Sequence, residues 1–369
     1  TAFDTIATHL DPLTGHSLHD TVFTTTDHRI DETRHTQPAL FAFEVALYRL
    51  IESWGITPDY LIGHSIGEIS AAHIAGILTL EDACTLVAAR ARLMQAQPTG
   101  GAMVALQATE DEVLPHLTDR VSIAALNGPR STVIAGDDDA VEHITRHFED
   151  DGRKTKWLNV SHAFHSPHMD GMLQEFKTTL DTLTYHPATI PLVSNLTGQP
   201  LTTTDADYWT RHVREAVRFA HGIHTLDTLG VTTYLDLGPD GTAAAMTTNT
   251  LPDTTHAHII TTHRTNQPPT HSLTHALTHL ITTGTTPHWH TYYNPTHTTP
   301  HPLPTYAFQH QRYWLPATQN TTTDLTTAGL TPTHHPLLAA TLELPDNSGH
   351  LLTGRLSLTT HPWLAHHAV

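Results

Sequence analysis

The sequence predicts an α/β fold into which a second, smaller α/β unit is inserted. A Gly-x-Ser-x-Gly motif at residues 63–67 lies between a short apolar run at 59–62 and a helical pattern at 66–75, which is the strand, turn and helix of a nucleophile elbow. Residues 102–160 follow the order β-α-β-β-α-β of a split, ferredoxin-like unit. Helices and strands of the larger unit then resume from 161 to about 250.

The individual elements follow from apolar spacing and from turn residues. Before and around the motif, helices are predicted at 38–54 and 80–95, and the second ends at Pro98-Thr99-Gly100-Gly101. In the inserted unit we expect strands at 102–106, 121–126, 132–135 and 154–160, and helices at 110–117 and 138–149. Beyond it, helices are expected at 167–183 and 208–229, and strands at 192–194 and 233–237.

Composition excludes several classes of function. The chain has 369 residues, with 18 Lys and Arg against 36 Asp and Glu, and a formal charge of −18 argues against a nucleic-acid partner. There is no apolar run of 18 residues and no signal-peptide pattern, so no membrane partner is expected. The single cysteine, Cys84, fits both core packing and a reducing cytoplasm, the expected location.

No metal is expected, although the chain holds 34 histidines. His271, His275 and His279 repeat at helical spacing, but histidine and threonine are enriched throughout the chain after about residue 250. Compositional bias therefore explains the spacing better than a metal site does.

Ser65, at the centre of the motif, is the predicted nucleophile. The sharp turn and the close approach of helix to strand predict that neither Gly63 nor Gly67 has room for a Cβ atom. The N–H of Ile66, at the start of the following helix, would point at an oxyanion formed on the attacked carbonyl.

A serine nucleophile needs a base, and the discriminating region is Ser161 to Pro167. Here the chain re-enters the larger unit, where a cleft is expected. His165 precedes Ser166-Pro167, and because a proline can start a helix, turn backbone could fix the imidazole. From the residues alone, His165 as a base and His165 as an ordinary turn residue remain equally open.

The motifs Gly-His-Ser-Ile-Gly-Glu at 63–68 and His-Ala-Phe-His at 162–165 resemble those of the acyltransferase domains of modular type I polyketide synthases, malonyl-CoA type. These domains are close kin of malonyl-CoA:acyl carrier protein transacylases. The resemblance extends to Thr36-Gln37-Pro38-Ala39-Leu40, Asn127-Gly128-Pro129 and Asp236-Leu237-Gly238-Pro239, in the family's order and spacing.

The resemblance implies a domain organisation. Residues 1–262 would be the acyltransferase domain, a transacylase-like large α/β-hydrolase-like subdomain with the ferredoxin-like subdomain at about 101–160. Residues 263–316 would hold a C-terminal helix and the post-acyltransferase linker, followed by a flexible linker at 317–333. Residues 334–369 resemble the beginning of a hot-dog dehydratase domain, in which the family pattern would place the catalytic histidine at His367.

The resemblance also implies roles for individual residues. Ser65 would accept the acyl group and His165 would be its general base, oriented by a backbone carbonyl rather than by an acid. The family's arginine lies 25 residues after the serine, at Arg90, where a guanidinium can grip the free carboxylate of a malonyl group. The alternative for Arg90 is a solvated helix charge paired with Glu81 or Asp82. The remaining substrate-binding positions carried over are Gln37, Ile66, Asn127, His162 and Phe164.

The activity implied is the transfer of a malonyl unit from malonyl-CoA to the phosphopantetheine thiol of an acyl carrier protein, with no cofactor bound to the chain itself. Phe164 and Ile66 match the malonyl-selecting version of the motifs, and a bulky Phe164 would crowd a methyl branch. The neighbouring ketosynthase and dehydratase domains of the same synthase are the other expected partners.

Two departures from the family bear on this expectation. The family begins with a strand and a Gly-Gln-Gly-Ser-Gln segment that supplies a second oxyanion donor, and this chain starts after it, so we expect impaired activity without that strand. The pattern of the dehydratase also stops before its glycine. The rival functions are an α/β-hydrolase, with an acid drawn from Asp137 to Asp139, and a non-catalytic scaffold.

Overall fold

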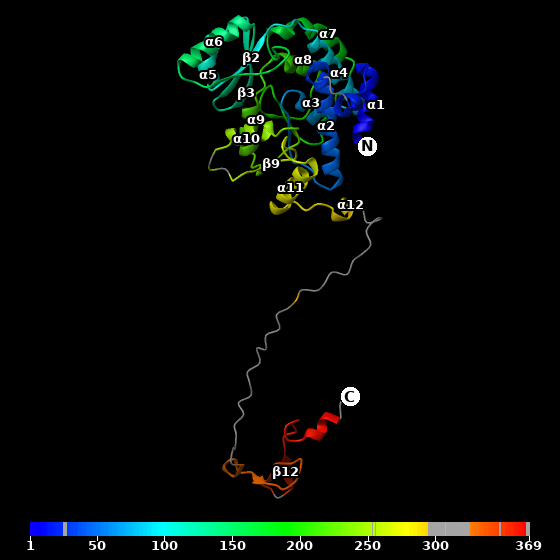
Figure 1. Ribbon diagram of the computed structural model, residues 1–369, viewed down its shortest axis with the longest axis vertical. Coiled ribbons are helices and arrows are strands. Elements are labelled where there is room, and N and C mark those ends of the chain that lie inside the picture. Colours follow the sequence, from blue (N-terminus) through cyan, green and yellow to red (C-terminus); the bar gives the residue numbers. More distant parts are fainter. Residues whose placement is uncertain are drawn as a thin grey trace. The chain divides into compact units, whose positions relative to one another are not determined.

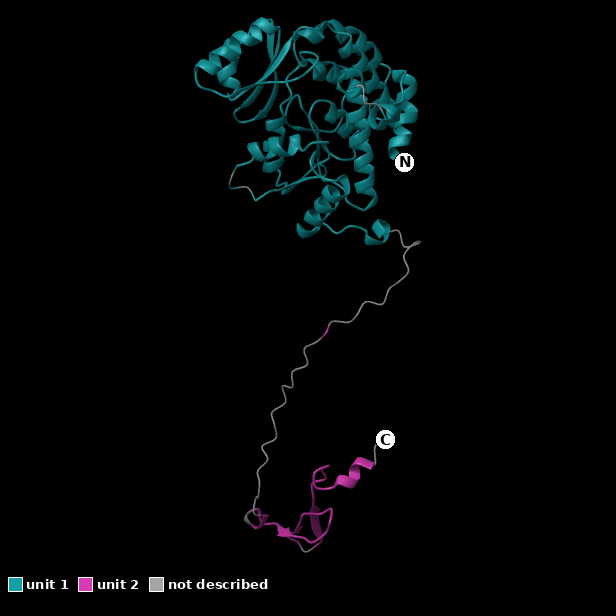
Figure 2. Ribbon diagram, in the orientation of Figure 1, with its two compact units in different colours: residues 1–299 teal, residues 300–369 magenta. Residues whose placement is uncertain are grey.

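The computed structural model describes residues 1–24, 28–252, 254, 256–293, 307, 325–346 and 348–366. It divides into two compact units, Thr1–Thr299 and Pro300–Val369, which Figure 2 shows in teal and magenta. Most of the predicted linker at 263–333 beyond residue 293, and His367 itself, lie outside the described residues.

Helices surround the predicted elbow in unit 1. They are α1 (Ala2–Thr14), α2 (Thr33–Ser53), α3 (Ile66–Ile74) and α4 (Leu80–Gln95). In Figure 1 the blue α1 and α2 and the lighter α4 lie side by side. Their apolar faces, with Phe41, Ile69 and Leu86 fully buried, form a shared core with α7 (Leu173–Leu180) and α8 (Ala206–Arg214). The predicted helices in this region are confirmed.

The parallel strands of the larger subdomain are short. β1 (Leu61–Ile62) pairs in parallel with β6 (Leu192–Val193), which pairs with β7 (Pro200–Leu201), and β8 (Thr233–Asp236) pairs in parallel with β9 (His258–Thr261). The strand expected at 59–62 is thus only two residues long. Because the carboxyl ends of parallel neighbours meet at one edge, the elbow after β1 lies beside the residues that follow β6.

The inserted unit has the expected ferredoxin-like topology. Its sheet runs β3 (Val121–Gly128), β4 (Ser131–Gly136), β2 (Ala102–Leu106), β5 (Thr155–Trp157), with every pairing antiparallel. The helices are α5 (Glu110–Val113), which passes into a 3-10 turn at Leu114–His116 containing Pro115, and α6 (Asp138–Asp150). This subdomain forms one end of unit 1 in Figure 1.

The helix predicted at 208–229 is wrong as one element. It is two helices, α8 and α9 (Phe219–Thr228), separated by extended backbone at Glu215. Between them, Val217 joins the small subdomain, because its N–H donates to the Ala124 carbonyl and its carbonyl accepts from Leu126. The segment 215–218 therefore connects the two subdomains.

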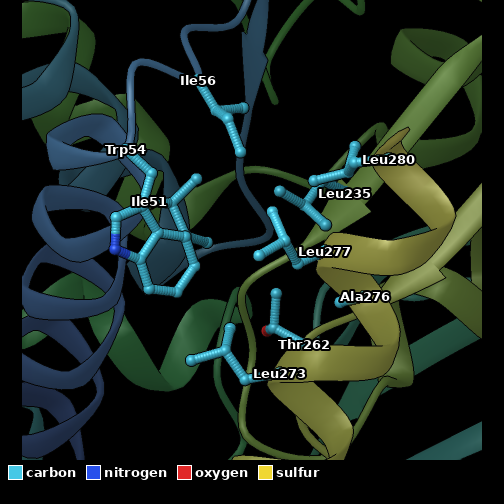
Figure 3. Close-up of a pocket in the computed structure, with 9 residues that line it drawn as sticks. All are labelled: Ile51, Trp54, Ile56, Leu235, Thr262, Leu273, Ala276, Leu277 and Leu280. Carbon is cyan, nitrogen blue, oxygen red and sulfur yellow. The ribbon is translucent and has the colours of Figure 1, made fainter. Parts of the chain in front are cut away.

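The remaining helices of unit 1 are α10 (Thr242–Thr250), α11 (Pro269–Thr282) and α12 (Trp289–Tyr293). Of these, α10 packs against β8 and β9, and α11 packs against β9. Figure 3 shows how Leu277 and its neighbours on α11 face Ile51 and Trp54 of the α2 end and Leu235 of β8. The space between these side chains does not admit a water molecule, so it is packed core and not a ligand site.

Unit 2 contains a three-stranded antiparallel sheet of β10 (Thr331–Pro332), β11 (Ala340–Glu343) and β12 (His350–Thr353). A 3-10 turn spans Pro362–His366. Within the described part of the chain, no helix has both the length and the apolar character needed to cross a membrane.

Candidate active site

The nucleophile elbow is present at residues 63–67. Ser65 stands between the end of β1 and the start of α3 with φ 52° and ψ −111°, backbone angles that a non-glycine residue rarely adopts. Such strain costs about 1–3 kcal/mol and must be held by the surrounding structure. A Cβ at Gly63 would lie 2.1 Å from the Gly67 carbonyl carbon, so only glycine fits there.

The steric requirement predicted for Gly67 is wrong. A Cβ at this position would meet only the Glu44 carboxyl oxygens, at 3.7 Å, an ordinary contact distance. The close approach of helix to strand is borne by Gly63 alone, because the backbone of Gly67 and Glu68 is what crowds Gly63.

Ser65 and His165 are hydrogen-bonded across 100 residues of sequence. The Ser65 Oγ lies 2.9 Å from the His165 Nε2, and the His165 Nδ1 lies 2.9 Å from the Glu215 carbonyl oxygen. Since a carbonyl can only accept, Nδ1 carries the proton and Nε2 accepts from the serine hydroxyl. This is the arrangement of a nucleophile and its base, with a backbone carbonyl in place of an acid.

The surroundings of His165 keep its imidazole neutral. Burial lowers the pKa of His165 well below its usual value, and the nearby Arg90, His212 and His64 lower the pKa further. A base must be unprotonated to accept the serine proton, so the site favours the working form of the imidazole.

Arg90 on α4 reaches the same serine. Its Nη2 donates to the Ser65 Oγ at 2.9 Å and its Nη1 donates to the Gln37 Oε1 at 2.5 Å. The residue is 2% exposed, and burial lowers the pKa of Arg90 to about 9. Among the described residues Arg90 forms no ion pair with a carboxylate, and its buried Nε has no hydrogen-bond partner. The alternative of a solvated pair with Glu81 or Asp82 is therefore excluded.

Asn127 reaches the site from the small subdomain. It lies on β3, and its Oδ1 accepts a hydrogen bond from the His64 Nε2 at 2.8 Å. His64 immediately precedes the nucleophile, and burial lowers the pKa of its imidazole. Sequence reasoning did not assign a role to His64, although it stands inside the motif that located Ser65.

Ile66, His162 and Phe164 are the remaining predicted residues near Ser65 and His165, which together are called the dyad below. Ile66 is the first residue of α3, where an N–H has no intrahelical acceptor. Both ring nitrogens of His162 are taken by the protein, one by the Ser161 Oγ at 3.0 Å and one by the Gln97 carbonyl at 3.2 Å. Phe164 is half-buried between two apolar cores, with its ring 6.1 Å from that of His162.

Asn195 is a site residue that sequence reasoning missed. Its Oδ1 accepts from the Ser65 N–H at 2.8 Å, and its Nδ2 donates to the Gly63 carbonyl at 2.7 Å. Its position in the sequence could have indicated it, because Asn195 directly follows the strand expected at 192–194. That strand pairs in parallel with β1, so the residues after both strands lie at the same edge of the sheet.

The structure also locates the acid nominated for a hydrolase, the histidines considered for a metal site, and the single cysteine. Asp137, nominated as the acid of a hydrolase, bonds to His168 at 2.6 Å and to Arg120 at 2.5 Å, and makes no contact with His165. Among the described residues no group of three or more His, Cys, Asp or Glu is placed to hold a metal ion. Cys84 is fully buried in the core.

Comparison with protein families gives two matches. The sequence pattern of the acyl transferase domain family matches residues 1–287, and that of the polyketide synthase dehydratase domain matches residues 335–369. The chain is 47% identical over 380 residues to polyketide synthase GfsA of Streptomyces halstedii and 46% identical over 382 residues to the spectinabilin polyketide synthase system protein NorB of Streptomyces orinoci. These alignments cover 100% of this chain but only 5% and 18% of the relatives.

Solved structures give the same picture. The acyltransferase domain from the second module of the salinomycin polyketide synthase matches with a TM-score of 0.78 and 49% identity, over 82% of this chain and 72% of that one. The malonyl CoA-acyl carrier protein transacylase (fabD) from Coxiella burnetii matches with a TM-score of 0.67 and 25% identity, over 76% of this chain and 90% of that one.

Proposed function

The chain belongs to the acyl transferase domain family of polyketide synthases, and from that premise we propose that it loads a malonyl unit from malonyl-CoA onto Ser65 and passes it to the phosphopantetheine thiol of an acyl carrier protein. The protein is an acyltransferase. The choice of a malonyl donor, the roles of individual residues and the partners are our proposal.

The observation that carries the proposal is the unpaired buried cation beside the nucleophile. Arg90 is a guanidinium with no carboxylate partner among the described residues, and one of its nitrogens touches the Ser65 Oγ. Burying a charge without a counter-ion is unfavourable, so the site is suited to a ligand that brings a carboxylate. A malonyl group carries one on the carbon next to the reacting thioester carbonyl, and a planar guanidinium binds it through two parallel hydrogen bonds.

The chemistry follows in two halves. The Ser65 Oγ attacks the thioester carbon while His165 Nε2 takes the hydroxyl proton, and the Ile66 N–H at the start of α3 stabilises the oxyanion. The C–S bond then breaks, and the CoA sulfur leaves with the proton from His165. In the second half the carrier's thiol gives its proton to His165 and its sulfur attacks the serine ester; the C–O bond to Ser65 breaks, and His165 returns the proton to the Ser65 Oγ.

Phe164 would set the preference for malonyl over methylmalonyl units. It is half-buried beside the dyad segment, and His162, bonded on both ring nitrogens, fixes the loop that carries it. A bulky ring there leaves less room for a methyl branch on the α-carbon. One methyl group is worth about 1–3 kcal/mol of discrimination, so the preference would be incomplete. Gln37 would hold Arg90 in place for the carboxylate.

The partners would be those of a synthase. Besides malonyl-CoA, these are an acyl carrier protein and the ketosynthase and dehydratase domains of the same polypeptide. The dehydratase match at residues 335–369 supports the last of these.

The test is intact-mass labelling of the protein with malonyl-CoA and methylmalonyl-CoA offered together, beside Ser65→Ala and Arg90→Ala. We expect a stable malonyl adduct that Ser65→Ala abolishes and that Arg90→Ala greatly reduces. An adduct that water removes within one turnover would instead support a hydrolase, and the absence of any adduct would support a scaffold. A dominant methylmalonyl adduct would overturn the donor assignment alone.

A further inference from the structure

Glu68, one turn after the nucleophile, is a buried carboxylate that the proposed mechanism does not use. It lies in the first turn of α3 and is 0% exposed. The helix N-terminus favours a negative charge there. A carboxylate is kept in such a place only where donors satisfy it, and those donors come from two separate segments of the chain.

The first segment is the one that holds the elbow. The backbone N–H of Asn195 donates to the Glu68 Oε2 at 2.8 Å. The side chain of the same asparagine bonds both sides of the strained turn, at the Ser65 N–H and the Gly63 carbonyl. Glu68 therefore fixes the residue that fixes the serine.

The second segment is α8, which supports the base. Tyr208 donates its hydroxyl hydrogen to the Glu68 Oε1. One turn later the buried His212 Nε2 lies 3.3 Å from the Glu68 Oε2 without forming a hydrogen bond to it. Glu215, the residue that caps the C-terminus of α8, presents its carbonyl to the His165 Nδ1. Carbonyls at a helix C-terminus lack intrahelical donors and carry partial negative charge, so this one can orient and support the imidazole.

We propose that Glu68 is a positioning residue for both members of the dyad, acting through Asn195 on Ser65 and through α8 on His165. One buried carboxylate thus sets the alignment of two groups that lie 100 residues apart in sequence. The inference rests on the proposed role of Ser65 as nucleophile, but its test does not need malonyl-CoA.

The replacement Glu68→Gln separates positioning from bulk. It keeps the size of the side chain but turns one acceptor oxygen into a donor. In one orientation the new donor faces the Asn195 N–H, and in the other it forces the Tyr208 hydroxyl to turn from donor to acceptor and to donate to Ser194 instead. The matched control is Glu44→Gln. Glu44 is half-buried near the elbow, but desolvation raises the pKa of its carboxyl to about 7, and the carboxyl accepts a hydrogen bond from the Ser70 hydroxyl at 2.6 Å.

The measurement is the labelling of Ser65 by a fluorophosphonate, in which the serine oxygen bonds phosphorus, fluoride leaves and His165 takes the proton. The amplitude reports the folded fraction, and the first-order rate at saturating probe reports the alignment. We expect Glu68→Gln to lower that rate about 10- to 100-fold at nearly full amplitude, as misplacements of about 1 Å do. Glu44→Gln should label at the wild-type rate.

The outcomes are decisive. A wild-type rate in Glu68→Gln, or an equal loss in Glu44→Gln, overturns the inference. If Glu68→Gln does not fold, Tyr208→Phe breaks only the α8 side and must still slow the rate, and a wild-type rate there overturns the inference too. A wild-type protein that accepts the fluorophosphonate but not malonyl-CoA would refute the proposed donor alone, and one that accepts neither would refute both proposals.

Discussion

Glu68 and Arg90 are two buried ionisable side chains near Ser65, and their polar atoms are satisfied in opposite ways. Glu68 accepts hydrogen bonds from Asn195 and Tyr208 and lies beside His212. Arg90 has only Gln37 and the nucleophile itself, and its Nε is unpaired. A charge that the protein satisfies serves the fold and the alignment of the site, whereas a charge left unsatisfied is available to a ligand.

The largest predicted effect is on the free energy of unfolding, which replacement of Glu68 should lower and replacement of Arg90 should raise. Glu68→Ala leaves buried donors unsatisfied and should lower the free energy of unfolding by about 3–5 kcal/mol. Arg90→Met removes a charge without a counter-ion and should raise it by about 1–2 kcal/mol. Urea unfolding of the two variants measures both. Equal destabilisation by both replacements would contradict the distinction.

The next largest effect is on the rate at which malonyl-CoA acylates Ser65. Arg90→Ala should slow acylation of Ser65 by malonyl-CoA about 100- to 1,000-fold, because truncating one partner of a buried ion pair costs about 2–5 kcal/mol. Acetyl-CoA, which has no free carboxylate, serves as the control and should react no more slowly than with the wild type. Stopped-flow release of CoA measures both rates, and an equal loss with the two donors would mean that Arg90 serves Ser65 and not the carboxylate.

A smaller effect is expected at the apolar side of the site. Phe164→Ser should reduce the preference for malonyl-CoA over methylmalonyl-CoA by about 10- to 200-fold, because one methyl group is discriminated by about 1–3 kcal/mol. Competition between the two donors, read by intact mass, gives the ratio directly. Phe43, half-buried on α2, offers a matched ring, and Phe43→Ser should leave the ratio unchanged.

The smallest effect concerns pH. The groups facing His165 are Arg90, His212, His64 and the Glu215 carbonyl, and burial together with Arg90 holds the pKa of His165 well below its usual value. The neutral imidazole is the active form, so the rate of fluorophosphonate labelling should persist below pH 6.5 and be lost as pH falls through the lowered pKa. In Arg90→Met this loss should move to higher pH. A profile that does not move would show that burial alone sets the pKa.

Much of the fold and the main site residues could be predicted from the sequence. The family assignment, the α/β class and the order of the ferredoxin-like subdomain are confirmed. The structure also brings Ser65, His165, Arg90 and Gln37 together, as their motif positions imply. The fold predictions succeeded because an elbow motif and an alternation of strands and helices are local patterns, whereas the positions of His165, Arg90 and Gln37 were implied by the resemblance of short motifs and a spacing to a known family.

What could not be predicted depends on contacts between distant segments. Glu68 and Tyr208 are 140 residues apart, and no local pattern links them. The break after Arg214 was missed because apolar spacing continues on both sides of it, while the cause of the break is the pairing of Val217 with β3. The role of Gly67 was overestimated because two glycines in one turn look alike in sequence.

The segment 215–218 has a consequence for the engineering of hybrid synthases. Within four residues it supplies the carbonyl that orients the base, at Glu215, and a backbone partner for the small subdomain, at Val217. A graft that exchanges only the small subdomain brings in a foreign β3 but keeps the host's segment 215–218, with which β3 forms its backbone hydrogen bonds. Chimeras that take β3 and segment 215–218 from the same parent should therefore retain more turnover than chimeras that take them from different parents, even when every catalytic side chain is the same.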